Sequence, residues 1–219
     1  MKNPRIGSLL SRKISSLAVA AALTASLTAA AAPSGEYPQG GYVTVGSQTI
    51  SIEDFLARGR LTMNESPDAD HSRLIDFSQW VQCFTLNDTE MVIKEYVTWW
   101  NGIPSSKRLK CGNSEFGYKH IRERHEKDWQ AKLDRITPSG LFPNVSWDDL
   151  MSAAVVNALM VPDWAENVSG DKRCFVVKMG FYNQNNVLLD AYNVRAVASN
   201  SNDRVITALP LKDGGSFCS

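Results

Sequence analysis

The segment CFVVKMGFYNQNNVLLDAYNVRAVAS (174–199) decides the fold, because two long runs of β-branched and aromatic residues flank an Asn-rich turn in it. Such residues favour strands, and the asparagines at 185–186 favour a tight turn between them. A third run, DRVITALPL (203–211), follows a second polar turn at 199–202. The three runs predict an antiparallel β-meander in the C-terminal part of the chain.

The segments before this meander are mostly patterned as helices. Apolar residues recur at spacings of three and four over 72–84, and a second helix is expected over 89–100. A short hairpin at 42–52 and a brief helix ending near Gly59 precede them, and 105–117 is expected to be a loop with a small basic cluster.

Two further helices are expected in the middle of the chain. The first covers 117–136 and is stopped by Pro138 and Gly140. The second follows Ser146 and Asp149, whose spacing resembles a capping box. Helices first and an antiparallel sheet afterwards predict an α+β fold, with N-terminal helices packed on a C-terminal antiparallel β-meander.

The first 32 residues predict a secretory signal peptide. Four basic residues precede an Ala-rich apolar run at 17–32, and no acidic residue occurs before Glu36. That run has 16 residues, fewer than the roughly 20 that a membrane-spanning helix needs. We therefore expect a secreted protein, extracellular or periplasmic, with no membrane association after signal cleavage.

The charge of the chain is balanced overall but uneven along it. Cleavage after residue 32 removes four positive charges and no negative ones, so the net charge of 0 becomes −4. Such a chain is not a globally basic nucleic-acid binder. Between Lys107 and Arg135, however, nine cations face five anions, which indicates a local site for an anionic ligand.

The four cysteines favour two disulfides, because an even number in an exported chain is typical of disulfide bonding. Three pairings are open, and the most local one joins Cys83 to Cys111 and Cys174 to Cys218. No Cys-x-x-Cys spacing occurs, so neither a zinc site nor any other metal or cofactor is expected.

Two of the three histidines lie in the helical segment GYKHIRERHEKDWQAKLDRI (117–136). His120 and His125 are five residues apart and diverge by about 140° around an ideal helix. This spacing does not suit a shared metal, and it leads us to expect imidazoles that point in different directions. The competing interpretation is a solvated helix with ion pairs such as Arg122–Glu126 and with structural histidines.

Histidine beside basic residues suits the cleavage of RNA phosphodiesters without a metal. A base takes the proton of the ribose 2′-hydroxyl, which attacks phosphorus, and an acid protonates the departing 5′-oxygen. Cationic and hydroxyl donors stabilise the charge that develops on the phosphoryl oxygens. A histidine pair, Arg or Lys and a Ser or Thr suffice for this reaction.

The order of elements is similar to that of a known group of toxins. A basic histidine-bearing helix (GYKHIRERH, 117–125) is followed by Arg135 and, later, by a last strand that reads VITALP (205–210). This order resembles the C-terminal ribonuclease toxins of bacterial competition systems. They belong to the superfamily that groups barnase, EndoU, colicin ribonucleases and RelE, and they include toxin domains similar to pancreatic-type ribonuclease.

The resemblance implies a ribonuclease site on the second half of the chain. The catalytic candidates are His120, His125, Arg135, Arg195 and Thr207, and the candidates for substrate binding are Lys119, Arg122 and Arg124. The aromatic residue that follows the threonine in the family is replaced by Leu209 here. RNA is the implied substrate, and a cognate inhibitor protein is the implied partner.

Together these features divide the chain into a signal peptide (1–32), an N-terminal hairpin and helical accessory region (33–105) and a ribonuclease-toxin-like α+β domain (106–219). The aromatic pair Trp99-Trp100 is expected in the core. The alternative function is that of a secreted, disulfide-stabilised binding or host-interaction protein without catalysis.

Overall fold

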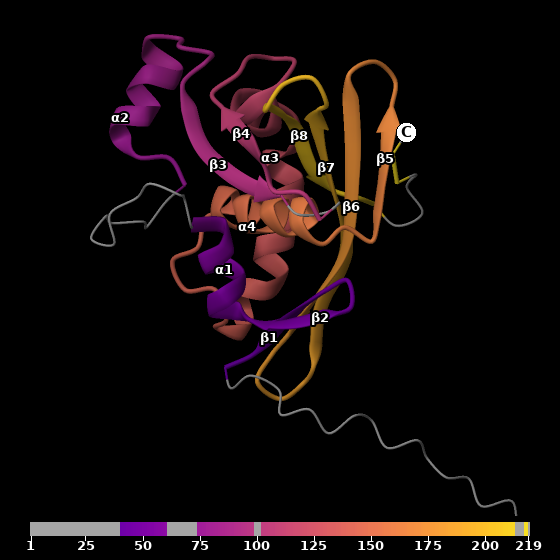
Figure 1. Ribbon diagram of the computed structural model, residues 1–219. Helices are drawn as coiled ribbons and strands as arrows, with labels where there is room; N and C mark the ends of the chain where they lie inside the picture. The colour runs from indigo at the N-terminus through magenta and orange to yellow at the C-terminus, as the bar shows by residue number, and fades with distance from the viewer. Residues whose placement is uncertain (1–39, 61–73, 99–101, 213–216, 219) are drawn as a thin grey trace, which may run out of the picture. The chain divides into compact units, whose positions relative to one another are not determined.

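The computed structural model describes residues 40–60, 74–98, 102–212 and 217–218, which all belong to one compact unit (Figure 1). These residues form an α+β fold in which helices pack on an antiparallel sheet, as the sequence predicts. The expected signal peptide at 1–32 and the pair Trp99-Trp100 lie outside the described residues.

The main sheet has six strands, with β5 paired to β6 beside the path β2-β1-β6-β7-β8. Its strands are β1 (Tyr42–Val45), β2 (Gln48–Ser51), β5 (Trp164–Val168), β6 (Lys172–Tyr182), β7 (Leu188–Ser199) and β8 (Val205–Pro210). Strands β6, β7 and β8 form the predicted antiparallel meander. Strand β5 was not predicted, because Ala, Glu and Asn are poor strand formers; its pairing with β6 overrides that preference.

The two faces of this sheet carry different side chains. On β7, Val194, Ala196 and Ala198 are buried in the main core, whereas Arg195 and Val197 point to the opposite face. A small second cluster of apolar side chains covers that opposite face. It is formed by Cys174, Val176 and Leu211, with Val168, Val197, Leu209 and Cys218 packed against them.

Helices cover the main-core face of the sheet (Figure 1). The helical elements of the described chain are α1 (Ile52–Arg60), α2 (Phe77–Trp80), a π-helical turn η1 (Val81–Thr85), α3 (Gly117–Ile136), a 3₁₀ turn η2 (Thr137–Ser139) and α4 (Trp147–Met160). The expected capping box at α4 is confirmed, because Ser146 Oγ accepts from Asp149 N while the Asp149 carboxylate accepts from Ser146 N.

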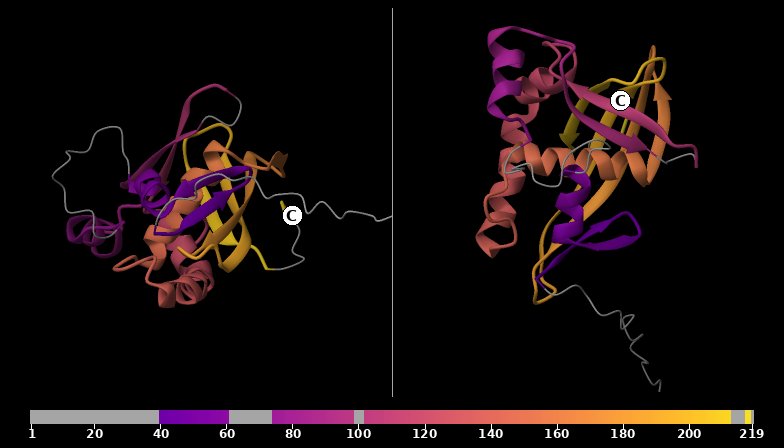
Figure 2. Two further views of the ribbon diagram at one scale, coloured as in Figure 1. Left: turned by 90° about the horizontal axis from the view of Figure 1, so that it is seen from below. Right: turned by 60° about the vertical axis from the view of Figure 1, so that its left-hand side comes forward.

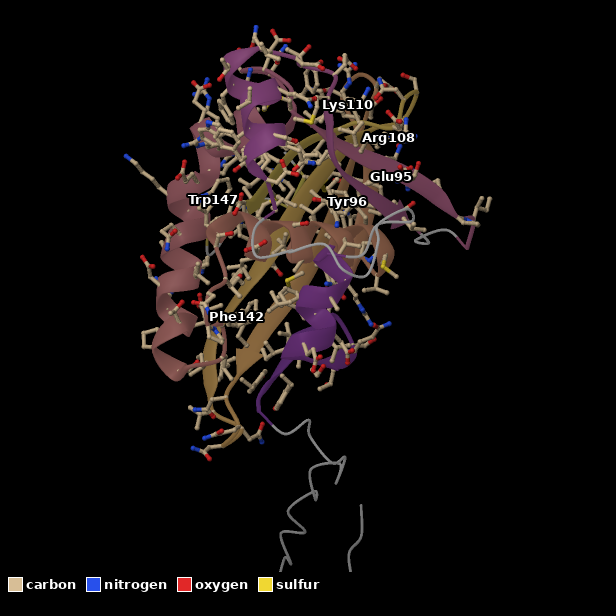
Figure 3. All side chains as sticks on the ribbon, turned by 90° about the vertical axis from the view of Figure 1, so that its left-hand side faces the viewer. Glu95, Tyr96, Arg108, Lys110, Phe142 and Trp147 are labelled. Atoms are coloured by element: carbon tan, nitrogen blue, oxygen red, sulfur yellow. A yellow bond between two sulfur atoms is a disulfide. The ribbon has the colours of Figure 1, made fainter. Side chains whose placement is uncertain are left out.

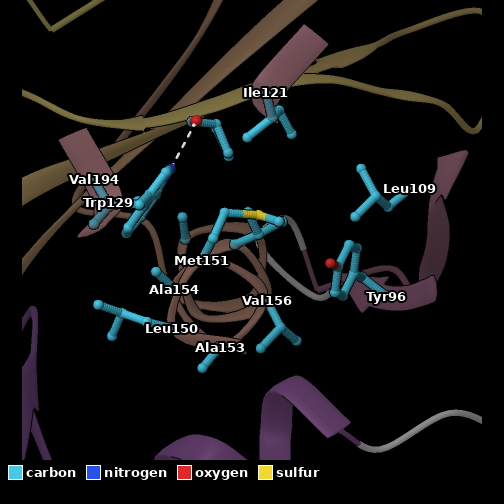
Figure 4. Close-up of a cluster of buried hydrophobic side chains, with 14 of the residues drawn as sticks. Tyr96, Leu109, Ile121, Trp129, Leu150, Met151, Ala153, Ala154, Val156 and Val194 are labelled. Carbon is cyan, nitrogen blue, oxygen red and sulfur yellow. Dashed lines mark hydrogen bonds between the residues drawn. The ribbon is translucent and has the colours of Figure 1, made fainter. Parts of the chain in front are cut away.

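Helix α4 is the centre of the core. Every residue from 148 to 159 is buried, and Figure 4 shows apolar side chains around its whole circumference. Its buried polar groups are hydrogen-bonded: Ser152 Oγ donates to the Gly59 carbonyl (3.0 Å), and Asn157 Oδ1 accepts from Arg58 (2.8 Å). A helix that is apolar all round must be buried on all sides, which explains why α1, α3, β3 and the sheet all pack on it.

Two local predictions are wrong. Residues 89–100 were expected to be a helix and 105–117 a loop, but both contribute to a hairpin of β3 (Val92–Thr98) and β4 (Ser105–Lys110). Tyr96 and Thr98 are buried while Glu95 and Val97 are not, which is the alternation of a strand. β-Branched residues and a pairing partner decide in favour of strand here.

Ion pairs join the two sides of this hairpin to each other and to the turn before β8. Arg108 lies 2.7 Å from Asp203 and 3.6 Å from Glu95, and Lys110 lies 2.7 Å from Glu90. Figure 3 shows Glu95, Arg108 and Lys110 close together on the hairpin. Figure 2 shows α2 beside this hairpin, at the end of the sheet away from β1 and β2.

Within the described part of the chain, residues of 33–105 pair directly with strands of the later region. Strand β1 pairs with β6, with Tyr42 opposite Tyr182, and therefore belongs to the main sheet. The β3–β4 hairpin also pairs Glu95 with Arg108, so one element spans the boundary that was expected at 105/106.

The disulfides follow the most local pairing. Cys83 is bonded to Cys111, and Cys174 is bonded to Cys218. The first disulfide joins η1 to the residue after β4, and the second joins the C-terminal segment to the outer face of β6.

Helix α3 is fixed against the edge of the sheet at β8. The Trp129 indole Nε1–H donates to the Ala208 carbonyl (3.1 Å), and both residues are fully buried (Figure 4). Leu133 and Ile136 continue the buried stripe of the helix, as its apolar pattern predicts. This contact covers a strand edge that would otherwise expose backbone hydrogen-bonding groups.

We expect Trp129→Phe to lower the free energy of unfolding by about 2–4 kcal/mol, because it leaves a cavity and a buried carbonyl without its donor. The matched control is Trp147→Phe, whose ring stacks on Tyr118 at 5.8 Å and is only partly buried. Urea denaturation monitored by circular dichroism measures both variants, and the control is expected to lose about 1 kcal/mol or less. Equal losses would contradict the role given to Trp129.

Candidate active site

The two histidines of α3 lie next to each other. The ring centroids of His120 and His125 are 6.0 Å apart, with 76° between the ring planes. The expectation that the imidazoles point in different directions is therefore wrong. Side chains on a helix lean toward its N-terminus, so His125 reaches back toward the turn that carries His120.

A backbone carbonyl fixes the tautomer of His120. Its Nδ1 lies 2.7 Å from the Ser114 carbonyl oxygen, which can only accept a hydrogen bond. Nδ1 therefore carries the proton, and in the neutral ring Nε2 keeps its lone pair. The hydrogen bond therefore holds the His120 ring in an orientation in which Nε2 can act as a base.

The loop that presents Ser114 has little conformational freedom. Gly112 and Gly117 both have positive φ values, +71° and +79°, which glycine adopts without strain. A Cβ at Gly112 would lie 1.9 Å from the Phe116 carbonyl oxygen, so no side chain fits there. Asn113 Oδ1 accepts from the backbone N–H of Glu115 (2.8 Å), and the Cys83–Cys111 disulfide anchors the start of the loop.

His125 is partly buried, with 18% of its side chain exposed. Burial lowers the pKa of His125, because desolvation disfavours the charged imidazolium. Asp128 opposes this effect from 3.5 Å, measured between Nδ1 and Oδ2, whereas the charges of His120 and Arg195 add to it. His125 Nδ1 has no hydrogen-bond partner among the described residues.

Arg195 and Thr207 share one face of the sheet. Val197 pairs with Thr207 and Arg195 pairs with Leu209, so Arg195 and Thr207 are diagonal neighbours on β7 and β8. This face is turned away from α4 and the main core. The charge of Arg195 contributes to the lowering of the pKa of His125.

Thr207 carries a hydroxyl with unused hydrogen-bonding capacity. Its Oγ1 is buried and has no partner within the part of the chain that the structure describes. Burial also lowers the pKa of the neighbouring Arg195 guanidinium. A partly buried cation and an unsatisfied hydroxyl on adjacent strands are suited to hold an anionic oxygen.

Arg135 is not brought to the histidines. It lies ten residues after His125, roughly 15 Å farther along the helix. Its guanidinium is 3.5 Å from Asp190, which also lies 3.3 Å from Lys132. The position of Arg135 thus suits a contact between α3 and β7 rather than a role beside the histidines.

The three expected substrate-binding residues line an open hollow of about 810 Å³ on the other flank of α3. Lys119, Arg122, Arg124 and Lys127 supply four positive charges to it, and Glu123 and Glu126 supply two negative ones. Lys119 donates to Asn87 Oδ1 (2.6 Å), and Arg122 stacks over the Trp80 ring at 4.6 Å. These contacts also attach α2 and the segment after η1 to α3.

The described residues show no group of three or more His, Cys, Asp or Glu side chains placed to hold a metal ion. Among the same residues, no helix is long and apolar enough to span a membrane. No protein-family model matches the chain, and no curated protein or solved structure matches it either.

Sequence reasoning missed two participants in the site. Asp128 follows His125 by three residues, a spacing at which helical side chains meet, so the helix pattern contained this signal. Ser114 acts through its backbone carbonyl, and a backbone contact has no signature in residue type.

The lowered pKa of His125 predicts a specific effect of pH on stability. Because the unfolded chain binds a proton near pH 6.5 and the folded chain only at lower pH, the contribution of neutral His125 is present above pH 6.5 and is lost as pH falls below it. Wild type and His125→Gln are compared by urea denaturation at pH 8 and pH 5.5. Wild type is expected to lose more stability than the variant on acidification; equal losses would contradict the burial of a neutral imidazole.

Proposed function

We propose that this protein is a secreted endoribonuclease that cleaves RNA by histidine acid–base catalysis, without a metal. The observation that carries the proposal is the histidine pair on α3, whose rings are 6.0 Å apart and of which one has its tautomer fixed by Ser114. Two imidazoles at this separation can act on neighbouring oxygens of a single phosphodiester. One imidazole removes a proton from the first oxygen, and the other donates a proton to the second.

In this mechanism His120 is the base. Its Nε2 accepts the proton of a ribose 2′-hydroxyl, and the oxygen attacks the adjacent phosphorus. His125 in its protonated form is the acid and donates to the departing 5′-oxygen. Because burial lowers the pKa of His125, this form is populated toward acidic pH. The products are a 2′,3′-cyclic phosphate and a 5′-hydroxyl, and Asp128 stabilises the imidazolium of His125 from 3.5 Å.

The phosphoryl oxygens need cationic and hydroxyl donors near this pair. Arg195 is the cation whose charge reaches His125, and Thr207 lies diagonally next to it with a free buried hydroxyl. Such preorganised donors stabilise the charge that builds up on the phosphoryl oxygens. Arg135 has no part in this mechanism, because it lies near the other end of the helix beside Asp190.

The two disulfides are compatible with action in an oxidising compartment. The resemblance to ribonuclease toxins adds a cognate inhibitor protein to the proposal. The competing function, a binding protein without catalysis, is favoured by apolar side chains that remain exposed, such as Phe77 and Leu86.

The two functions are separated by incubating the mature protein with end-labelled RNA in EDTA. Wild type is expected to cleave, and His120→Ala and His125→Ala are each expected to lose about 10²-fold or more of the rate. Arg135→Ala is the matched control from the same helix and is expected to retain activity. Absence of cleavage above the level of the His120→Ala, His125→Ala double variant would falsify the enzymatic function.

A further inference from the structure

The residues of α2 expose a large aromatic surface on the apolar face of the segment 72–84. Phe77 is 82% exposed, and Trp80, one helical turn later, is 36% exposed. A phenylalanine with this exposure contributes almost no burial free energy to the stability of the fold. We call Phe77 and Trp80 the aromatic platform.

The aromatic platform is held rigidly. Asp76 and Gln79 form a capping box at the start of α2, and Gln79 Nε2 donates to the Ile93 carbonyl of β3 (3.3 Å). The Trp80 ring stacks on Phe84 with centroids 4.1 Å apart. The Cys83–Cys111 disulfide then fixes the adjoining turn η1. An exposed aromatic ring on a rigid support binds a flat ligand with little loss of conformational entropy.

The neighbouring charges are those of an anion-binding surface. The Arg122 guanidinium lies over both Trp80 (4.6 Å) and Phe84 (5.1 Å), and the hollow beside it has a net charge of +2. The mature chain as a whole is expected to be acidic, so this surplus is local. Aromatic rings beside cations match the bases and phosphates of a single-stranded nucleic acid.

The platform and the histidine pair are connected over the exposed side of α3. At about 100° per residue, Arg124 projects between His120 and His125, and Lys127 projects between His120 and the flank that lines the hollow. Both side chains are exposed and line the hollow. The width of one helix, roughly 10–12 Å, separates the two flanks. A strand of a few nucleotides can span that width.

We propose that Phe77 stacks on a base of single-stranded RNA a few nucleotides from the cleaved phosphate, with Arg124 and Lys127 binding the phosphates in between. The choice of RNA rests on the function proposed above. The chemistry assigned to the platform, base stacking beside bound phosphates, does not itself require cleavage.

Binding is tested with a fluorescent single-stranded 2′-O-methyl RNA, which lacks the free hydroxyl that cleavage needs. Phe77→Ala is expected to weaken binding by about 5- to 100-fold in fluorescence anisotropy. The matched control is Leu86→Ala, because Leu86 is 69% exposed but is not aromatic, and it is expected to bind as wild type. Phe77→Trp is expected to restore binding, which distinguishes stacking from a loss of structure.

The salt dependence tests the phosphate contacts separately. Lys127→Ala is expected to make the slope of log affinity against log salt concentration shallower by about 0.7. Equal affinities of wild type and Phe77→Ala for the RNA would overturn the proposal that Phe77 stacks on a base. The aromatic platform would then be assigned to a protein partner instead. Absence of RNA binding by wild type would overturn it as well.

The two proposals fail in different ways. If RNA binding depends on Phe77 but unmodified RNA is not cleaved, the stacking proposal is supported and the ribonuclease proposal is contradicted. If RNA is cleaved but Phe77→Ala does not change the affinity, only the stacking proposal is contradicted.

Discussion

The hydrogen bond from the Trp129 indole to the Ala208 carbonyl is the contact on which the candidate site depends. It fixes α3 along the edge of the sheet at β8, where the buried stripe of the helix also packs. His125 lies one helical turn before Trp129, on the same side of the helix. The packing of Trp129 therefore also fixes the position of His125, whose pKa is lowered mainly by burial and to a smaller extent by the charge of Arg195.

A second constraint acts on His120 through the backbone. The loop between β4 and α3 depends on two glycines with positive φ and on the disulfide at Cys111, and it presents the Ser114 carbonyl to the imidazole. The site is thus assembled from a helix held at a strand edge and a loop held by a disulfide. Rigid supports of this kind preorganise catalytic groups, which is where much of enzymatic rate enhancement originates.

The sequence predicted the elements whose pattern is strong and local. The meander of β6, β7 and β8, the helices α3 and α4 and the capping box at Ser146 were all confirmed. Strand β3 was missed because its apolar spacing also fits a helix, and only pairing with β4 decides between the two. The meeting of His120 and His125 was missed because helix angles describe the Cα–Cβ directions and not the ends of long side chains. The exposure of Phe77 could not be predicted, because a periodic apolar face does not reveal what covers it.

The chemistry of the product ends tests the central claim most directly. Attack by a 2′-hydroxyl, with two histidines moving the protons, leaves a 2′,3′-cyclic phosphate on one fragment and a 5′-hydroxyl on the other. Mass spectrometry of an RNA oligonucleotide incubated with the mature protein in EDTA identifies both ends. The account predicts these termini and no cut where the nucleotide 5′ to the scissile bond is 2′-deoxy. Fragments with 3′-hydroxyl and 5′-phosphate ends, or an intact oligonucleotide, would contradict it.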